Sequence, residues 1–179
     1  MTGASTRVLA LNLGYHIRSR EKGITVGSFR VRQGTLSDIE EMVRQRHEMF
    51  VDMGRPSAKA LRIHDSSFPD WARREMRAKR FICFLVENDG GEVIGGGSLW
   101  LRGVQPFPGY AGGKVPYLMS MYTAPGYRGR GVGTMLVKRA IEWSKSHGYT
   151  SITLHSSKMG RQLYEKLGWK SSPEMELIF

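Results

Sequence analysis

The spacing of apolar positions along the chain predicts strands and helices that follow one another in mixed order. Strands are indicated where apolar residues alternate with polar ones, or run continuously between turn residues. These segments are 28–32, 81–86, 92–101, 117–123, 151–155 and 174–179. Helices are indicated where apolar residues return at helical spacing after a capping pattern, such as Thr35 with Asp38, or after a proline. These segments are 35–54, 67–80, 135–143 and 159–167.

Two glycine-containing stretches refine this pattern. Asn88-Asp89-Gly90-Gly91 lies between two apolar runs and predicts a tight hairpin turn. Gly95-Gly96-Gly97 lies inside the next predicted strand, where glycine is unusual, and indicates a bulge or a close approach of backbone. The order of elements predicts an α/β fold, with a mixed sheet of six to seven strands flanked by about four helices.

Length and charge narrow the class of protein. The 179 residues are enough for one domain, and no apolar run approaches the ~20 residues of a membrane span. Residues 1–22 are basic, with no acid before Glu21, and we expect an N-terminal extension there and a single domain over 23–179. The formal net charge of +11 favours anionic partners, although a solvated basic surface explains it better than a nucleic-acid site.

The cysteine and the histidines predict neither a disulfide nor a metal site. Cys83 lies within the apolar run 81–86, so we expect a buried thiol with a raised pKa and no nucleophilic role. A single cysteine favours a reducing compartment, and we expect a cytoplasmic protein. The histidines show neither H-x-x-x-H spacing nor pairing with cysteine.

The most informative stretch is 117–143, in which a strand pattern passes through a glycine-rich turn into an amphipathic helix. The first N–H groups of a helix have no intrahelical partner and carry partial positive charge. Glycines let a phosphate approach the backbone, and Arg128 and Arg130 add charged, forked donors. This arrangement predicts an anion-binding site.

Two common phosphate-binding loops do not fit this turn. A P-loop requires Lys followed by Ser or Thr, where this chain has Val132 and Gly133. A dinucleotide-binding loop requires a third glycine, where this chain has Thr134, and an acidic residue at a suitable distance downstream.

The turn does match the pattern R-x-x-G-x-G from Arg128 to Gly133, and two further blocks follow at 154–157 and 160–169. With these motifs the chain resembles the GNAT superfamily of acetyl-CoA-dependent N-acetyltransferases. The resemblance covers residues 23–179 in general pattern and is specific from about residue 117 to residue 169. It implies a GNAT-like, mostly antiparallel sheet, and transfer of acetyl from acetyl-CoA, as co-substrate and without a metal, to a primary amine.

The resemblance also implies which residues hold acetyl-CoA. The backbone of the strand that ends at Thr123 would pair with the pantetheine arm as an extra strand would, and the glycine turn would bind the pyrophosphate. The implied residues are Met121, Tyr122, Thr123, Arg128, Gly129, Arg130, Gly131, Val132, Gly133, Thr134 and Ser157.

Two catalytic roles come from the same resemblance. Tyr164 lies where the family places a tyrosine near the CoA sulfur, and we expect its phenol to protonate the departing thiolate as a general acid. The alternative for Tyr164 is a core aromatic at helical spacing. A backbone N–H, from Met121 or Tyr122, is expected to polarise the thioester oxygen.

The general base is not singled out by the sequence. Glu48 and Asp52 lie one helical turn apart in the first predicted helix, a segment that flanks the acceptor pocket in the family. A solvated polar face is the alternative for each of them. His155 could accept a proton near neutral pH or hold a loop by hydrogen bonding, and the family often has Asn near this position.

We therefore predict an N-acetyltransferase that acts on a small-molecule amine. Helix 35–54 and the loop that contains Phe107 and Tyr110 are expected to enclose a modest acceptor pocket. Acetylation of a peptide or protein amine stays open, as does a homodimer. The rival from another class is a basic RNA- or ribosome-associated module that keeps the fold without turnover.

Overall fold

The computed structural model describes residues 28–54, 57–106, 108, 113–175 and 177. The predicted N-terminal extension and the side chains of Phe107 and Tyr110 lie outside this part of the chain. Strands form one sheet in the order β1-β2-β3-β4-β5, antiparallel except for the parallel pair β4 and β5. Their bounds are β1 Arg30–Gln33, β2 Phe81–Glu87, β3 Val93–Gly103, β4 Lys114–Thr123 and β5 Thr153–Leu154.

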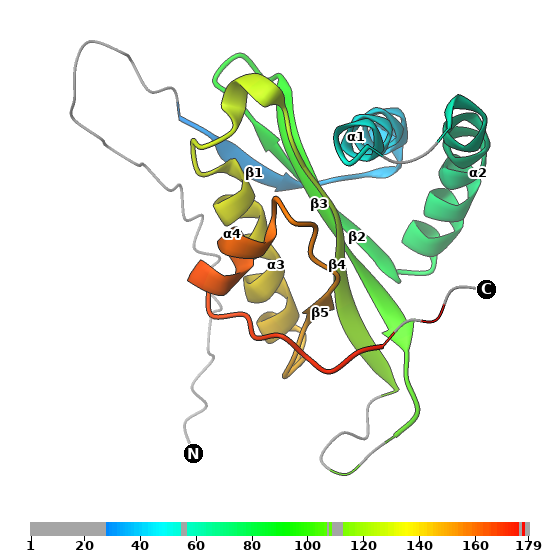
Figure 1. Ribbon diagram of the computed structural model, residues 1–179, viewed down its shortest axis with the longest axis vertical. Coiled ribbons are helices and arrows are strands. Elements are labelled where there is room, and N and C mark those ends of the chain that lie inside the picture. The colour runs from blue at the N-terminus through cyan, green and yellow to red at the C-terminus, as the bar shows by residue number, and fades with distance from the viewer. Residues whose placement is uncertain (1–27, 55–56, 107, 109–112, 176, 178–179) are drawn as a thin grey trace, which may run out of the picture.

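Helices cover both faces of this sheet, with α1 and α2 on one face and α3 and α4 on the other (Figure 1). Their bounds are η1 Leu36–Asp38, α1 Ile39–Asp52, α2 Ala58–Arg77, η2 Pro125–Tyr127, α3 Val132–Ser146 and α4 Arg161–Lys166. The apolar run of β2 supplies both cores: Cys83 packs toward α1 and α2, and its neighbour Phe84 toward α3. Cys83 is buried, as predicted, and this burial raises the pKa of its thiol to about 12.

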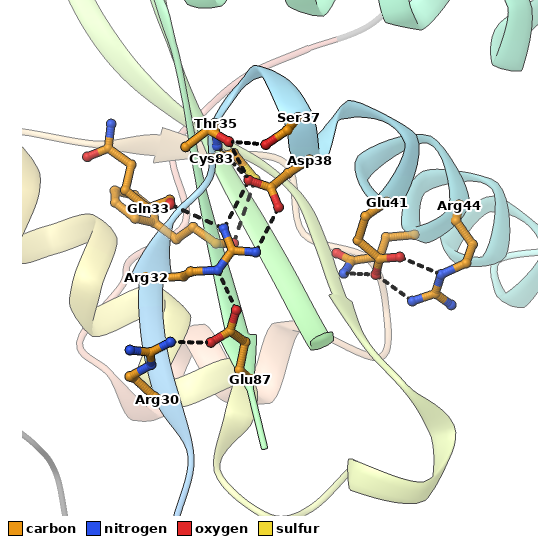
Figure 2. A network of polar contacts seen from close by, with 12 residues as sticks. Arg30, Arg32, Gln33, Thr35, Ser37, Asp38, Glu41, Arg44, Cys83 and Glu87 are labelled. Atoms are coloured by element: carbon orange, nitrogen blue, oxygen red, sulfur yellow. Dashed lines mark hydrogen bonds and ion pairs between the residues drawn. The ribbon is translucent and has the colours of Figure 1, made fainter. Parts of the chain in front are cut away.

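The start of the described chain is fastened to β2 by a polar network around Arg32 (Figure 2). The Arg32 guanidinium donates to Glu87 and to Asp38, with 2.7 Å between Nη2 and Asp38 Oδ1. Asp38 also accepts the backbone N–H of Thr35 at 2.7 Å, which confirms the predicted capping pattern. The hydrogen bond from Arg32 lowers the pKa of Asp38 to about 2.

The predicted start of the second helix is wrong. Helix α2 begins at Ala58, where the Ser57 hydroxyl accepts the Ala60 N–H, and it continues through Pro69. A proline inside a helix removes one backbone hydrogen bond, so the sequence indicated a helix start there. Burial of Leu61 before the proline and of Ala72 after it favours one continuous helix along the sheet.

The predicted sheet of six to seven strands is also too large, because the described residues form five strands. The expected last strand, 174–179, is irregular at its described positions. Met175 and Leu177 are 97% and 76% exposed, so these apolar residues have no sheet face on which to pack. The predicted hairpin turn is confirmed by the hydrogen bond from Gly91 N–H to the Asn88 carbonyl.

The glycines of β3 let both helical layers approach the sheet. A Cβ at Gly96 would lie 2.1 Å from the Gln45 side chain on α1. A Cβ at Gly95 would lie 2.7 Å from a Val132 methyl carbon on α3 and 2.9 Å from the Tyr122 carbonyl oxygen. The predicted close approach is therefore confirmed.

The pairing of β3 with β4 is irregular beside these glycines, but the bulge lies in β4 and not in the glycine strand where it was predicted as the alternative. Residues 96–98 of β3 face residues 119–122 of β4, so β4 carries one extra residue there. Ser120 has φ +55°, a left-handed conformation that bends the strand. The extra residue places the side chains of Ser120 and Tyr122 on the α1 side, where both make hydrogen bonds to that helix.

Substitution of Gly95 by alanine is expected to lower the free energy of unfolding by about 1–3 kcal/mol, because the added methyl meets backbone as well as a side chain. The matched control is Gly103→Ala on the same strand, where the nearest atom lies 3.9 Å from the added carbon. Urea unfolding of both variants measures the difference. Equal stability of the two variants would contradict this account of the glycines.

Candidate functional site

The turn between β4 and α3 is exposed where it begins and leads into the first turn of α3. Arg128, Gly129 and Arg130 are exposed, and Gly131, the N-cap of α3, has φ +89°. Within the described part of the chain, the N–H groups of residues 129–134 donate to no protein acceptor. Such amides at a helix N-terminus are available to an anion.

The arginines of this turn are oriented by neighbouring elements. Arg128 donates through Nε to the Thr123 carbonyl at 3.0 Å and forms an ion pair with Asp52 at the end of α1. The guanidinium carbon of Arg130 lies 5.6 Å from the centre of the Tyr127 ring. Asp52, predicted as a candidate base, thus binds an arginine of the glycine turn.

Strand β4 has an open edge beside this turn. The two residues of β5 pair only with Tyr117 and Leu118, so in the described chain no strand continues along 119–123 on that side. The bulge at Ser120 lies within this open segment. A free strand edge can bind an extended ligand through backbone hydrogen bonds.

Tyr164 projects from α4 into the core between α4 and the sheet. The residue is 8% exposed, and burial raises the pKa of its phenol to about 12. No described residue accepts or donates a hydrogen bond at this hydroxyl, yet the oxygen is not sealed from solvent. The ring is held by Trp169, with 5.8 Å between ring centres, so the hydroxyl is fixed in position and free to bind.

Glu48 lies against the bulged strand. Its carboxylate accepts hydrogen bonds from the Tyr122 hydroxyl and, at 2.8 Å, from Arg44. The hydrogen bond from Tyr122 and the contact with Arg44 hold the pKa of Glu48 below its usual value. Burial, and then Glu48, raise the pKa of Tyr122 to about 12. Glu48 is thus an anion that faces the strand on which the predicted oxyanion donor lies.

His155 and Ser157 make structural contacts near the end of β5. The ring of His155 bridges the Tyr117 hydroxyl at 2.6 Å and the Glu174 carboxylate at 2.8 Å, which holds the chain after α4 against β4. The Ser157 hydroxyl accepts the Gly160 N–H at 3.1 Å at the start of α4. The predicted base role of His155 and the predicted CoA contact of Ser157 stay predictions.

A group of residues that the sequence did not single out also lies on the α1 side of the bulge. Arg46 of α1 donates to the Ser120 hydroxyl and to His64 of α2, with 3.0 and 3.2 Å from Nη2 and Nε to His64 Nε2. The sequence carried no signal for this cluster, because its members are 18 and 74 positions apart.

A hollow of about 820 Å³ lies at the opposite end of α3 from the glycine turn. It is lined there by Trp143, Ser146 and His147, and none of the predicted site residues lines it. At 1.5 Å per residue, the length of α3 separates it from the turn by roughly 20 Å. This hollow is therefore separate from the candidate site.

No group of three or more His, Cys, Asp or Glu side chains in the described part of the chain is arranged to hold a metal ion. None of the described helices is long and apolar enough to cross a membrane.

Comparison with known proteins identifies relatives with this fold. A glucosamine 6-phosphate N-acetyltransferase from Trypanosoma brucei brucei is 33% identical over 106 residues, which are 59% of this chain and 68% of that protein. A crystal structure of a GCN5-related N-acetyltransferase from Ralstonia eutropha superposes with a TM-score of 0.78 at 28% identity, over 85% of this chain and 99% of that one. A crystal structure from Clostridium acetobutylicum, described as a predicted acetyltransferase with acetyl-CoA, gives a TM-score of 0.77 at 22% identity, over 84% and 96% of the chains.

The sequence model of the acetyltransferase (GNAT) family matches residues 44–169, from the middle of α1 to just beyond α4. This span contains the glycine turn, the bulged strand β4 and Tyr164. The chain therefore belongs to the acetyltransferase (GNAT) family of acetyl-CoA-dependent N-acetyltransferases.

Proposed function

We propose that this enzyme transfers an acetyl group from acetyl-CoA directly to a primary amine of a small molecule. The observation that carries the proposal is the placement of the open amides of residues 129–134 beside the open edge of β4. CoA contains a pyrophosphate with an extended pantetheine arm attached to it, and a site for it needs free amides and an open strand edge side by side.

The residues of this region fit the parts of acetyl-CoA. The N–H groups from Gly129 to Thr134 would bind the pyrophosphate, with charge from Arg128 and Arg130. The backbone of 121–123 would pair with the pantetheine arm, and Ser157 would contact the cofactor from the β5 side. Acetyl-CoA supplies the activated acetyl group, and the chain positions it and moves protons.

Two groups of the chain would act on the thioester. The N–H of Met121, at the bulge of β4, would donate to the carbonyl oxygen as negative charge develops there. The Tyr164 hydroxyl, which has no protein partner among the described residues, would donate its proton to the departing sulfur. Because burial raises the pKa of Tyr164 to about 12, the phenol carries this proton throughout the neutral range.

We assign the acceptance of the amine proton to Glu48, with a water molecule as intermediary. Glu48 is ionised and lies on the α1 side of the bulge. Its low pKa makes it a weak base, so removal of the proton to bulk solvent completes the step. Asp52, which is paired with Arg128, and His155, which is paired with Glu174, are the alternatives.

The small size of the acceptor is supported by the relative from Trypanosoma brucei brucei, which is named for an amino-sugar phosphate. Helix α1 is hydrogen-bonded to β4 through Arg46 and Glu48, on the side where the acceptor would bind. Assay of a panel of amines, peptides and proteins with acetyl-CoA tests the proposal. Acetylation of a protein lysine in preference to every small amine would contradict it.

The double variant Arg128→Ala/Arg130→Ala is expected to weaken CoA binding by about 30- to 100-fold, because each guanidinium contributes a charged hydrogen bond to phosphate. Isothermal titration calorimetry measures the change. The matched control is Lys138→Ala/Lys145→Ala, which removes the same charge from exposed positions further along α3. Steeply salt-dependent RNA binding without any CoA binding would favour the RNA-associated module instead.

A further inference from the structure

Arg46 is a partly buried arginine without a carboxylate partner among the described residues. Its three hydrogen bonds go to neutral groups, the Ser120 hydroxyl and the His64 imidazole, and no ion pair to it is formed within the described chain. Arg44, two residues away and exposed, binds both Glu41 and Glu48. Buried charges in proteins are normally the paired ones, so the arrangement at Arg46 requires an explanation.

The groups that contact Arg46 directly carry no negative charge. Because arginine can only donate, His64 Nε2 must accept, and the ring proton therefore lies on Nδ1, which faces Asp65 at 3.1 Å. The rings of Phe68 and Phe50 lie 4.5 and 5.4 Å from the guanidinium carbon. Aromatic faces stabilise a cation but do not neutralise it.

The cation is nevertheless accessible and lies close to the proposed reaction centre. Arg46 keeps part of its surface exposed, and its remaining N–H donors have no acceptor among the described residues. It binds Ser120, the residue next to Met121, whose N–H is the proposed donor to the thioester. Burial lowers the pKa of Arg46 to about 10, as expected for a cation that is partly removed from water.

We propose that Arg46 binds an anionic group of the amine acceptor, a phosphate or a carboxylate, and thereby selects amines that carry such a group. This inference rests on the proposed function. The forked donors of a guanidinium match the paired oxygens of both groups. His64 and Asp65 orient the guanidinium, and Arg46 fixes the anion so that the amine lies beside the bulge of β4.

Calorimetry on protein saturated with CoA tests this assignment with two pairs of ligands. The phosphate arm compares glucosamine 6-phosphate with glucosamine, and the carboxylate arm compares alanine with alaninamide. The wild-type protein is expected to bind the anionic member of at least one pair at least 10-fold more tightly. Arg46→Met is expected to remove this preference and Arg46→Lys to retain part of it, since lysine keeps the charge without the fork. The arm that shows the preference identifies the group.

A second variant separates this role from the general effect of charge and from a structural role. Arg73→Met on α2 removes an arginine that is paired with Asp70, and it is expected to keep the wild-type preference. The inference is overturned if the wild-type protein binds the anionic and the neutral ligand of each pair equally tightly. It is also overturned if Arg46→Met weakens the binding of anionic and neutral ligands equally. The wild-type comparison does not depend on the folding of any variant, and thermal unfolding checks that each variant is folded.

CoA affinity is measured first. Absence of CoA binding counts against the proposed function, whereas CoA binding without a preference for anionic amines overturns only the role of Arg46.

Discussion

Replacement of Gly131 by valine is expected to weaken CoA binding by more than about 100-fold, the largest effect that we expect for a single substitution. Gly131 has φ +89° at the N-cap of α3, a conformation that a β-branched residue adopts only with strain of about 1–3 kcal/mol. Relief of that strain would turn the open amides of 129–134 away from a common centre. The branched side chain would also occupy the space of the phosphate.

Isothermal titration calorimetry with CoA measures this effect, and the matched control is Gly148→Val. Gly148 follows the opposite end of α3, has φ +80° and has no neighbouring atom within 4 Å of an added Cβ. Valine there carries the same kind of backbone strain, so it is expected to lower stability similarly and to leave CoA affinity unchanged. If Gly131→Val binds CoA as tightly as Gly148→Val does, the glycine turn is not the phosphate site.

Replacement of Tyr164 by phenylalanine is expected to lower kcat by about 100-fold, at the lower end of the range for loss of general acid catalysis. The hydroxyl has no hydrogen-bond partner among the described residues, so its removal leaves no buried group unsatisfied. The melting temperature and the CoA affinity are therefore expected to stay close to those of the wild type. A fall in kcat without a change in stability or CoA affinity would show that Tyr164 acts as a general acid and not only as a core aromatic.

Steady-state kinetics between pH 6 and about pH 10 provides the measurement. A phenol with a pKa of about 12 is protonated throughout this range, so loss of its proton with rising pH is not expected to limit the wild-type rate. The control is Tyr149→Phe, a tyrosine that stacks on Trp143 near the far end of α3. Unchanged turnover in Tyr164→Phe would remove the acid role and leave the ring as part of the core.

The features that the sequence predicted well are those set by neighbouring residues. The turn at Asn88–Gly91, the capping pattern at Thr35 and the buried run of β2 each depend on a few consecutive side chains. The glycine turn belongs to the same class, because positive φ and an open helix start are properties of a short segment. Family membership follows from motifs of this kind.

The errors arose where a local rule was outweighed by packing. Pro69 indicates a helix start by itself, but the burial of Leu61 and Phe68 along one face of α2 favours a helix that continues through it. The apolar positions at the C-terminal end indicate a strand, but Met175 is exposed and pairs with no neighbour in the described sheet. The spacing of apolar residues shows which secondary structure a segment can form, but it does not show whether a neighbouring strand is available for pairing.

By itself, the sequence determined the class of fold, the glycine turn before α3 and the family, because each depends on residues close together along the chain. Only the tertiary structure decided what the candidate side chains touch: Asp52 binds Arg128, Glu48 binds Tyr122, and Arg46 lies unpaired beside Ser120. These contacts join positions 74 or 76 residues apart. The extra residue in β4 turns Ser120 and Tyr122 toward α1, and one inserted residue in a strand changes the face on which every later side chain lies.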